Sequence, residues 1–196
     1  IMGYDVAVVG ATGAVGIEML RTLEKRNFQV SKLSLLASQR SAGKTLSFKG
    51  DSITVQELKK DSFNGVDIAL FSAGGGTSKE YAEFAVEAGA IVVDNSSAFR
   101  SDEDVPLVVP EVNAHALKNI PKGIVANPNC TTMVAMPVLK PLHEEAGLEN
   151  LIVSTYQATS GAGLSGVEEL SSQILEAGDS AINLTHNGSA IEFSDG

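Results

Sequence analysis

The chain has 196 residues, a formal net charge of -10 and a single cysteine; 43% of its residues are hydrophobic and 19% are charged. This composition excludes a disordered chain and predicts a soluble α/β protein with one complete domain and part of a second. The acidic balance argues against nucleic acid as a partner, and no apolar run approaches the roughly 18 residues that a membrane helix needs. One cysteine cannot form an internal disulfide, so we expect a reducing compartment and a cytoplasmic protein.

Short apolar runs alternate with segments of helical periodicity along the chain. Strands are predicted over residues 4–9, 33–37, 66–71, 91–93, 107–109, 124–126 and 151–158. Helices are predicted over 17–25, from the capping-box sequence Thr77-Ser78-Lys79-Glu80 through Ala88, over 131–146 with a kink or break at Pro137 and Pro141, and over 164–177. Strands alternating with helices imply right-handed crossovers and a doubly wound, mostly parallel sheet.

A glycine-rich segment joins the first predicted strand to the first predicted helix. It comprises Gly10, Ala11, Thr12, Gly13, Ala14, Val15 and Gly16. Small residues let the backbone approach a pyrophosphate, and unpaired N–H groups at the helix start bind it. The spacing is G-x-x-G-x-x-G instead of G-x-G-x-x-G, and a glycine-rich turn without a ligand is the alternative. The position between strand and helix favours a Rossmann-like dinucleotide site.

The end of the second predicted strand indicates which nucleotide is bound. An NAD site usually has Asp or Glu here for the ribose 2′-hydroxyl, but residues 36–44 contain no acid. Ser38, Arg40 and Ser41 offer hydroxyl and guanidinium donors that suit a 2′-phosphate. We therefore predict NADP as the cofactor; an ordinary solvated loop is the alternative.

The single cysteine follows a predicted buried strand and opens a predicted helix. The local sequence is Asn127-Pro128-Asn129-Cys130-Thr131-Thr132, in which Asn129 and the threonines can cap the helix start. The positive end of the helix dipole favours the thiolate form of Cys130. A buried, inert thiol is the commoner fate of a lone cysteine, but these flanking residues favour a nucleophile.

Taken together, several segments resemble aspartate-semialdehyde dehydrogenase, and the match runs almost end to end. They are residues 10–16, 38–41, 94–100, 110–113, 127–132 and 156–161. The resemblance implies NADPH-dependent reductive dephosphorylation of L-aspartyl 4-phosphate to L-aspartate 4-semialdehyde, in biosynthesis of lysine, methionine and threonine. It also implies an NADP-binding domain over 2–131, followed over 132–196 by the beginning of a truncated α+β catalytic and dimerisation domain, and hence a homodimer.

The resemblance assigns roles residue by residue. Cys130 matches the nucleophile that forms a thioester, and Gln157 matches the glutamine that positions the reacting group near the sulfur. Arg100, Asn129 and Ser160 match substrate-binding positions, although Arg100 beside Asp102 could instead form a surface ion pair. Besides the glycine loop and residues 38–41, the positions expected to border the cofactor are Ser72, Ala73, Gly74, Asn95, Ser96, Gly161 and Gly163.

The family's catalytic histidine belongs to a later part of its catalytic domain. His115, His143 and His186 do not match its motif, so we assign none of them catalysis and expect no metal site. We therefore expect a fragment with little or no turnover, whose uncovered edges favour self-association. Two alternatives stay open: an N-acetyl-glutamyl-phosphate reductase-like enzyme and a catalytically silent nucleotide-binding module.

Overall fold

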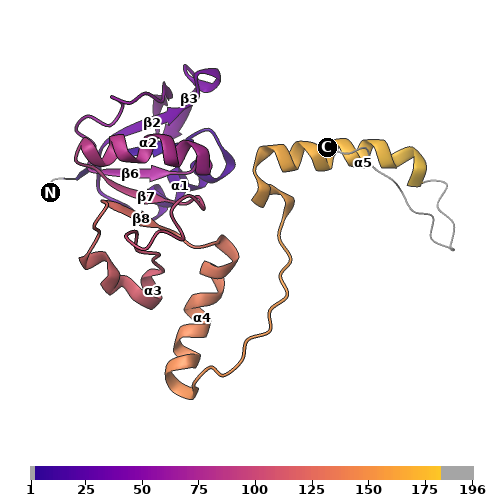
Figure 1. The fold of residues 1–196 in the computed structure, drawn as a ribbon. Coiled ribbons are helices and arrows are strands. Elements are labelled where there is room, and N and C mark those ends of the chain that lie inside the picture. Colours follow the sequence, from indigo (N-terminus) through magenta and orange to yellow (C-terminus); the bar gives the residue numbers. More distant parts are fainter. Residues whose placement is uncertain (1–2, 182–196) are drawn as a thin grey trace. The chain divides into compact units, whose positions relative to one another are not determined.

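The computed structural model describes the backbone of residues 3–181 and the side chains of residues 3–178. The chain forms two compact units, Ile1–Ser154 and Thr155–Gly196. The first unit contains a layered α/β domain, and the second contains helical segments (Figure 1).

The first unit is organised around a six-stranded parallel sheet with the order β5-β2-β1-β6-β7-β8. The strands are β1 (Tyr4–Val9), β2 (Val30–Ala37), β5 (Gln56–Glu57), β6 (Ile68–Phe71), β7 (Ile91–Asp94) and β8 (Ile124–Ala126). β1 lies in the middle of the sheet. The chain adds β2 and β5 on one side of β1, and then β6, β7 and β8 on the other side. The predicted doubly wound, parallel sheet is therefore confirmed, with its change of direction between β1 and β6.

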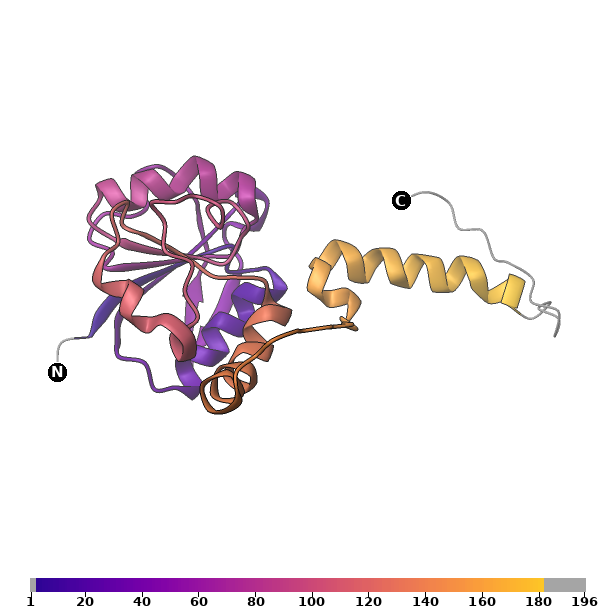
Figure 2. The ribbon, with the colours of Figure 1, turned by 60° about the horizontal axis from the view of Figure 1, so that its bottom comes forward.

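Helices cover both faces of this sheet. The α-helices of the unit are α1 (Ala14–Lys25), α2 (Gly75–Glu87), α3 (Pro110–Asn113) and α4 (Cys130–Ala146). Leu20 of α1 packs in a core cluster that contains Val8, whereas Ala82 of α2 packs in a second cluster that contains Ala7. Since successive strand residues point to opposite faces, α1 and α2 lie on opposite sides of the sheet (Figure 2).

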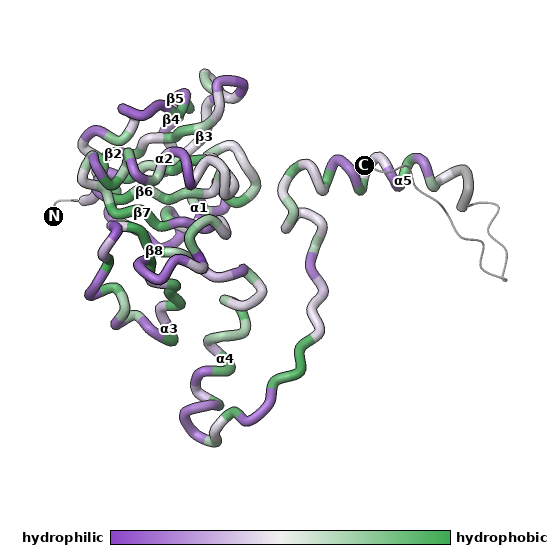
Figure 3. Tube along the Cα trace, viewed as in Figure 1, coloured by the Kyte–Doolittle hydropathy of each residue, from purple (hydrophilic) through white to green (hydrophobic). Residues whose placement is uncertain are grey.

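The central strands are apolar over most of their length, with Asp5 in β1 and Asp94 in β7 as charged exceptions, as expected for strands largely buried on both faces. Val6, Val8 and Val9 are at most 1% exposed, and Phe71 stacks on Phe63 with ring centroids 5.8 Å apart. Figure 3 shows the same apolar character along β6 and β7. Shorter elements complete the unit: η1 (Gln39–Ser41), the antiparallel pair β3 (Thr45–Phe48) and β4 (Asp51–Thr54), and η2 (Ala114–Lys118).

Two predicted strands are wrong. Residues 107–109 form no strand, and only Leu107 makes an isolated parallel bridge to Ala126. Residues 151–158 contain no strand either, and Ile152 is 98% exposed. An apolar run becomes a strand only when a neighbouring strand accepts its backbone hydrogen bonds. No described segment pairs with residues 151–158.

The structure also departs from two predicted features of the helices. Helix α2 begins at Gly75, with Gly74 as its N-cap at φ +84°, so the predicted capping box at Thr77 is wrong. Ser78 lies inside the helix and bonds to a buried carboxylate instead. Helix α4 runs through Pro137 and Pro141 without being split.

The second unit contains η3 (Thr159–Ala162) and α5 (Leu164–Ala181). The predicted helix over 164–177 is confirmed and continues to Ala181. None of the helices within residues 3–181 combines the length and the apolar character needed to cross a membrane.

Candidate active site at the carboxyl edge of the sheet

The loops that follow four neighbouring strands lie side by side at one edge of the sheet. In each case the first residue after a strand donates its N–H to a carbonyl near the end of the adjacent strand. The pairs are Gly10 to Leu36 (2.8 Å), Ser72 to Val9 (2.8 Å), Asn95 to Phe71 (3.0 Å) and Asn127 to Asp94 (2.9 Å). This ladder brings the glycine loop, the 72–74 loop, the 95–100 loop and the cysteine turn to a single edge, where open α/β sheets bind their ligands.

The glycine loop is packed tightly at two points. Gly10 has φ +83°, and a Cβ there would lie 2.5 Å from the carbonyl oxygen of Ser72. A Cβ on Gly16 would lie 2.2 Å from the carbonyl oxygen of Gly10. Glycine is therefore required at both positions, because it lets β1, the 72–74 loop and α1 approach one another.

The start of α1 offers a site for an anion. Gly13 is the N-cap, so the N–H groups of Ala14, Val15 and Gly16 have no partner within the helix. The first turn contains no acidic residue that would compete for these groups. Ala11 and Thr12 complete the loop. The geometry suits a pyrophosphate held by backbone N–H groups and the helix dipole.

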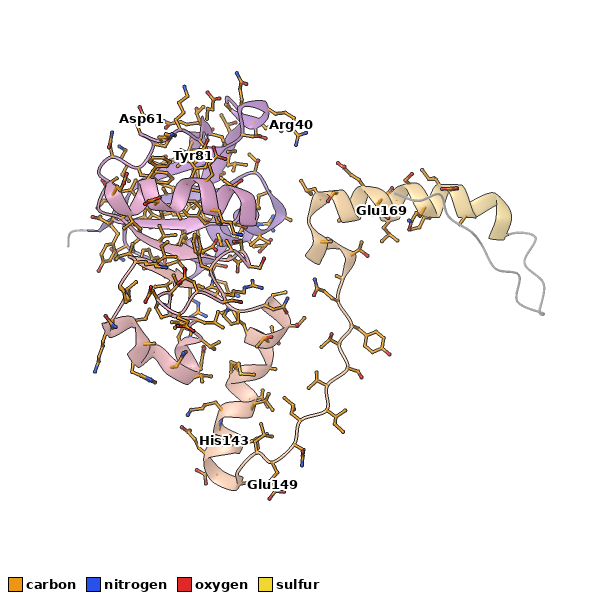
Figure 4. The ribbon with its side chains drawn as sticks, in the orientation of Figure 1. Arg40, Asp61, Tyr81, His143, Glu149 and Glu169 are labelled. Atoms are coloured by element: carbon orange, nitrogen blue, oxygen red, sulfur yellow. The ribbon has the colours of Figure 1, made fainter. Side chains whose placement is uncertain are left out.

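The predicted 2′-phosphate residues follow β2 in and beside η1. Ser38 and Arg40 are exposed, and the Arg40 side chain extends outward from the domain (Figure 4). Ser41 is only 7% exposed, and its N–H donates to the Ser38 carbonyl at 2.8 Å. Ser38 and Arg40 are thus accessible to a ligand, whereas the Ser41 side chain is largely enclosed.

Cys130 is the first residue of α4 and is exposed. Asn129 caps this helix, because its Oδ1 accepts the N–H of Thr131 at 2.9 Å. The predicted capping role of Asn129 is confirmed. The thiol therefore lies at a helix N-terminus beside groups that order the first turn.

Arg100 connects the 95–100 loop to the cysteine turn. Its Nε donates to the carbonyl of Asn127 at 2.8 Å, and its Nη2 donates to the carbonyl of Asn95 at 3.1 Å. Asp102 pairs with Lys122 at 2.7 Å instead, and this hydrogen bond holds the pKa of Asp102 below its ordinary value. Within the described part of the chain Arg100 forms no ion pair, which disfavours the surface ion-pair alternative.

The sequence assigned no role to Asp94, although its side chain is fully buried. Its carboxylate accepts hydrogen bonds from Ser78 Oγ (2.7 Å), Ser96 N–H (3.1 Å) and Ser96 Oγ (2.7 Å). The available signal was a carboxylate at the end of the apolar run 91–93. The sequence placed Ser78 in a predicted capping box, so its hydrogen bond to Asp94 was not predicted.

The remaining predicted residues belong to the second unit and form a local cluster there. A Cβ on Gly161 would lie 1.7 Å from Nε2 of Gln157, so the glutamine side chain packs directly over this glycine. Ser160 lies in η3, and Gly163 precedes α5 with φ +90°. The Gln157 side chain can therefore adopt this position only because residue 161 has no side chain.

The histidines have local roles or lie outside the site. His143 Nδ1 accepts the N–H of Leu148 at 3.1 Å and so caps the end of α4. His115 is exposed in η2, and His186 lies outside the described residues. Among the residues described, no three His, Cys, Asp or Glu side chains gather in a way that could hold a metal ion.

The doubly wound sheet, the tight glycine loop and the open helix start define a dinucleotide-binding domain of the dehydrogenase class. Comparison with known families agrees: residues 5–120 match the NAD-binding domain of semialdehyde dehydrogenases, and residues 139–194 match their dimerisation domain. The chain belongs to the semialdehyde dehydrogenase family, and its curated relatives are aspartate-semialdehyde dehydrogenases.

Three relatives illustrate the similarity. The aspartate-semialdehyde dehydrogenase of Streptomyces akiyoshiensis is 57% identical over 96% of this chain and 54% of its own length. The crystal structure of aspartate semialdehyde dehydrogenase II complexed with ASA from Vibrio cholerae is 46% identical, with a TM-score of 0.87 over 92% of this chain and 54% of that one. The Candida albicans enzyme with NADP is 32% identical, with a TM-score of 0.60 over 74% and 48%. The chain spans about half the length of the relatives it matches.

Proposed function

We propose that this chain supplies the NADP site and the nucleophile for reductive dephosphorylation of L-aspartyl 4-phosphate to L-aspartate 4-semialdehyde. One observation carries the proposal: the glycine loop and the Cys130 turn follow strands of the same sheet and meet at its carboxyl edge. The sequence identity to aspartate-semialdehyde dehydrogenases favours this substrate over that of an N-acetyl-glutamyl-phosphate reductase. The biosynthetic role in lysine, methionine and threonine formation follows from the same proposal.

In this mechanism the Cys130 thiolate attacks the acyl carbon of the acyl phosphate. A carbon–sulfur bond forms, the carbon–oxygen bond to phosphate breaks, and phosphate leaves with the bonding electrons. Bound NADPH supplies the hydride that reduces the thioester. The thiolate of Cys130 then leaves the reduced carbon, and the semialdehyde is released. The exposed position of Cys130 at the start of α4 leaves its sulfur accessible for this attack.

The cofactor is assigned to the residues around the glycine loop. Residues 10–16 hold the pyrophosphate, and Ser72, Ala73 and Gly74 border it. Ser38, Arg40 and Ser41 form the 2′-phosphate site, with Arg40 as the main donor because the Ser41 side chain is largely enclosed. The solved Candida albicans relative with NADP supports this choice of nucleotide.

The substrate-binding roles are assigned residue by residue, as the resemblance to the family implies. Arg100 binds the phosphate through Nη1, because its Nε and Nη2 already donate to backbone carbonyls. Asn129 and Ser160 bind the rest of the substrate, and Gln157 orients the reacting carbonyl. The residues that border the nicotinamide are Asn95, Ser96, Gly161 and Gly163. The dimerisation-domain match supports a homodimer.

We test the cofactor assignment by titrating NADPH and NADH into the chain and following fluorescence. Arg40→Ala should weaken NADPH binding by roughly 10- to 100-fold, because a hydrogen bond to a charged group contributes about 1.5–3 kcal/mol. NADH binding should hardly change. Arg26→Ala is the matched control, since it removes the same charge just beyond the opposite end of α1.

Each outcome has a distinct meaning. Equal affinities for the two nucleotides would contradict the NADP assignment. Binding of NADPH together with a Cys130 that reacts no faster than an ordinary thiol would select the silent nucleotide-binding module. Turnover of semialdehyde, phosphate and NADP at a normal enzyme rate would contradict the prediction of little or no activity.

A further inference from the structure

The buried Asp94 carboxylate at the end of β7 connects two parts of the domain. On one side it accepts the hydroxyl of Ser78 in α2 at 2.7 Å. On the other side it accepts both the N–H and the hydroxyl of Ser96, at 3.1 and 2.7 Å. All three partners donate to the carboxylate oxygens of Asp94. A fully buried carboxylate is costly unless it is hydrogen-bonded in this way.

The bonds continue from Asp94 into the loop that carries Arg100. Ser96 Oγ, which donates to Asp94, also accepts the N–H of Ala98 at 3.1 Å. This fixes the first turn of the 95–100 loop. At the other end of the loop, Arg100 Nε and Nη2 donate to the carbonyls of Asn127 and Asn95. The guanidinium is thus held between the ends of β7 and β8.

Arg100 is hydrogen-bonded to the backbone just before Cys130. Asn127, which accepts from Arg100, precedes Cys130 by three residues, so their backbones are at most about 11 Å apart. The guanidinium hydrogen-bonds to the segment that leads into Cys130, so its positive charge acts on an anion near the thiol at low ionic strength, where the Debye length is about 30 Å at 0.01 M salt.

We propose that Asp94 is a positioning residue: through Ser96 it orders the 95–100 loop and thereby holds the Arg100 guanidinium beside the Cys130 turn. The proposal rests on the function proposed above for Arg100 and Cys130. Asp94 itself touches no substrate in this scheme, because it is buried beneath the loop. Its action passes through Ser96 and not through Ser78, whose bond ties β7 to α2.

The two serines provide a matched pair of variants. Ser78→Ala and Ser96→Ala each remove one hydroxyl that donates to Asp94 at 2.7 Å. Only Ser96→Ala also removes the acceptor for the Ala98 N–H. Asp94→Asn keeps the shape of the side chain but replaces one accepting oxygen with a donor, which opposes the hydrogen of Ser96 or Ser78.

The measurement uses the single cysteine of the full 196-residue chain. The rates of Cys130 alkylation by iodoacetate, an anion, and by iodoacetamide, a neutral reagent, are determined, and their ratio is compared between variants. The ratio cancels changes in exposure or thiolate fraction and reports the local positive charge. At about 0.01 M salt, where screening is weak, Arg100→Gln should lower it by up to about twofold, as expected for a unit charge roughly 10 Å away in a medium close to water. Ser96→Ala and Asp94→Asn should lower it in the same direction, and Ser78→Ala should leave it unchanged.

Thermal unfolding confirms that each variant is folded. If Arg100→Gln lowers the ratio while Ser96→Ala and Asp94→Asn do not, the positioning role of Asp94 is overturned and the role of Arg100 survives. If Ser78→Ala lowers the ratio as much as Ser96→Ala, Asp94 acts only through general stability, and the proposal is again overturned. If Arg100→Gln leaves the ratio unchanged, the anion-binding role of Arg100 fails, and this inference fails with it.

Discussion

The glycine loop leaves no room for a Cβ atom at Gly16. We predict that Gly16→Ala lowers the free energy of unfolding by about 2 kcal/mol or more, because overpacking a filled site typically costs about 1–3 kcal/mol. Its Cβ would lie only 2.2 Å from the backbone oxygen of Gly10, which cannot move without shifting β1. NADPH binding should be lost together with stability, and urea unfolding with fluorescence titration measures both.

Gly76→Ala is the control for this substitution. Gly76 lies in α2, and a Cβ there meets no atom within 4 Å. Alanine in a helix is favoured over glycine by about 0.5–1 kcal/mol, so this variant should be as stable as the original or slightly more so. A Gly16→Ala variant that matched it in stability would contradict the tight contact between α1 and the loop.

At the scale of secondary-structure elements, the start of α4 determines how the nucleophile is presented. Asn129→Ala removes the oxygen that accepts the Thr131 N–H, and the loss of an N-cap costs about 1 kcal/mol. We expect the first helical turn to loosen and the alkylation of Cys130 by iodoacetamide to slow.

Asn129→Ser separates capping from other roles of this residue, because serine caps a helix about as well as asparagine. It should restore most of the Cys130 reactivity. Equal reactivity in the alanine and serine variants would show that the cap does not influence the thiol.

At the scale of the whole molecule, apolar side chains remain exposed in both units. On α5, Val167, Leu170 and Ile174 recur at helical spacing and are 42%, 42% and 60% exposed. Such a stripe is typical of a helix that packs against another surface. Since the segment matches a dimerisation domain, we predict dimers or larger assemblies of the chain.

Light scattering tests this prediction. Leu170→Glu should raise the dissociation constant roughly tenfold or more, since a carboxylate in an apolar contact must lose its hydration. Ser172→Glu adds the same charge about 200° around the helix and should have little effect. A monomeric original chain, or equal effects of the two variants, would argue against an interface on this stripe.

Local patterns in the sequence were sufficient for much of the fold and part of the site. The β-branched run at 4–9, the following glycines and the helix from 17 onward specify a β-α unit by themselves, because each pattern arises from short-range backbone and side-chain preferences. The same holds for Asn129 as the cap of the helix that begins at Cys130. The motifs around these elements also carried the resemblance to the family.

Tertiary structure decided what depends on partners distant in sequence. Residues 151–158 have the apolar character of a strand but pair with no described strand, so backbone hydrogen bonding and not hydropathy determines their state. Ser78 and Asp94 are 16 residues apart, and only the packing of α2 on β7 brings hydroxyl and carboxylate together. Asp102 is close to Arg100 in the sequence, yet the Arg100 guanidinium donates to backbone carbonyls just after β7 and β8. The parallel sheet places those two oxygens next to the guanidinium.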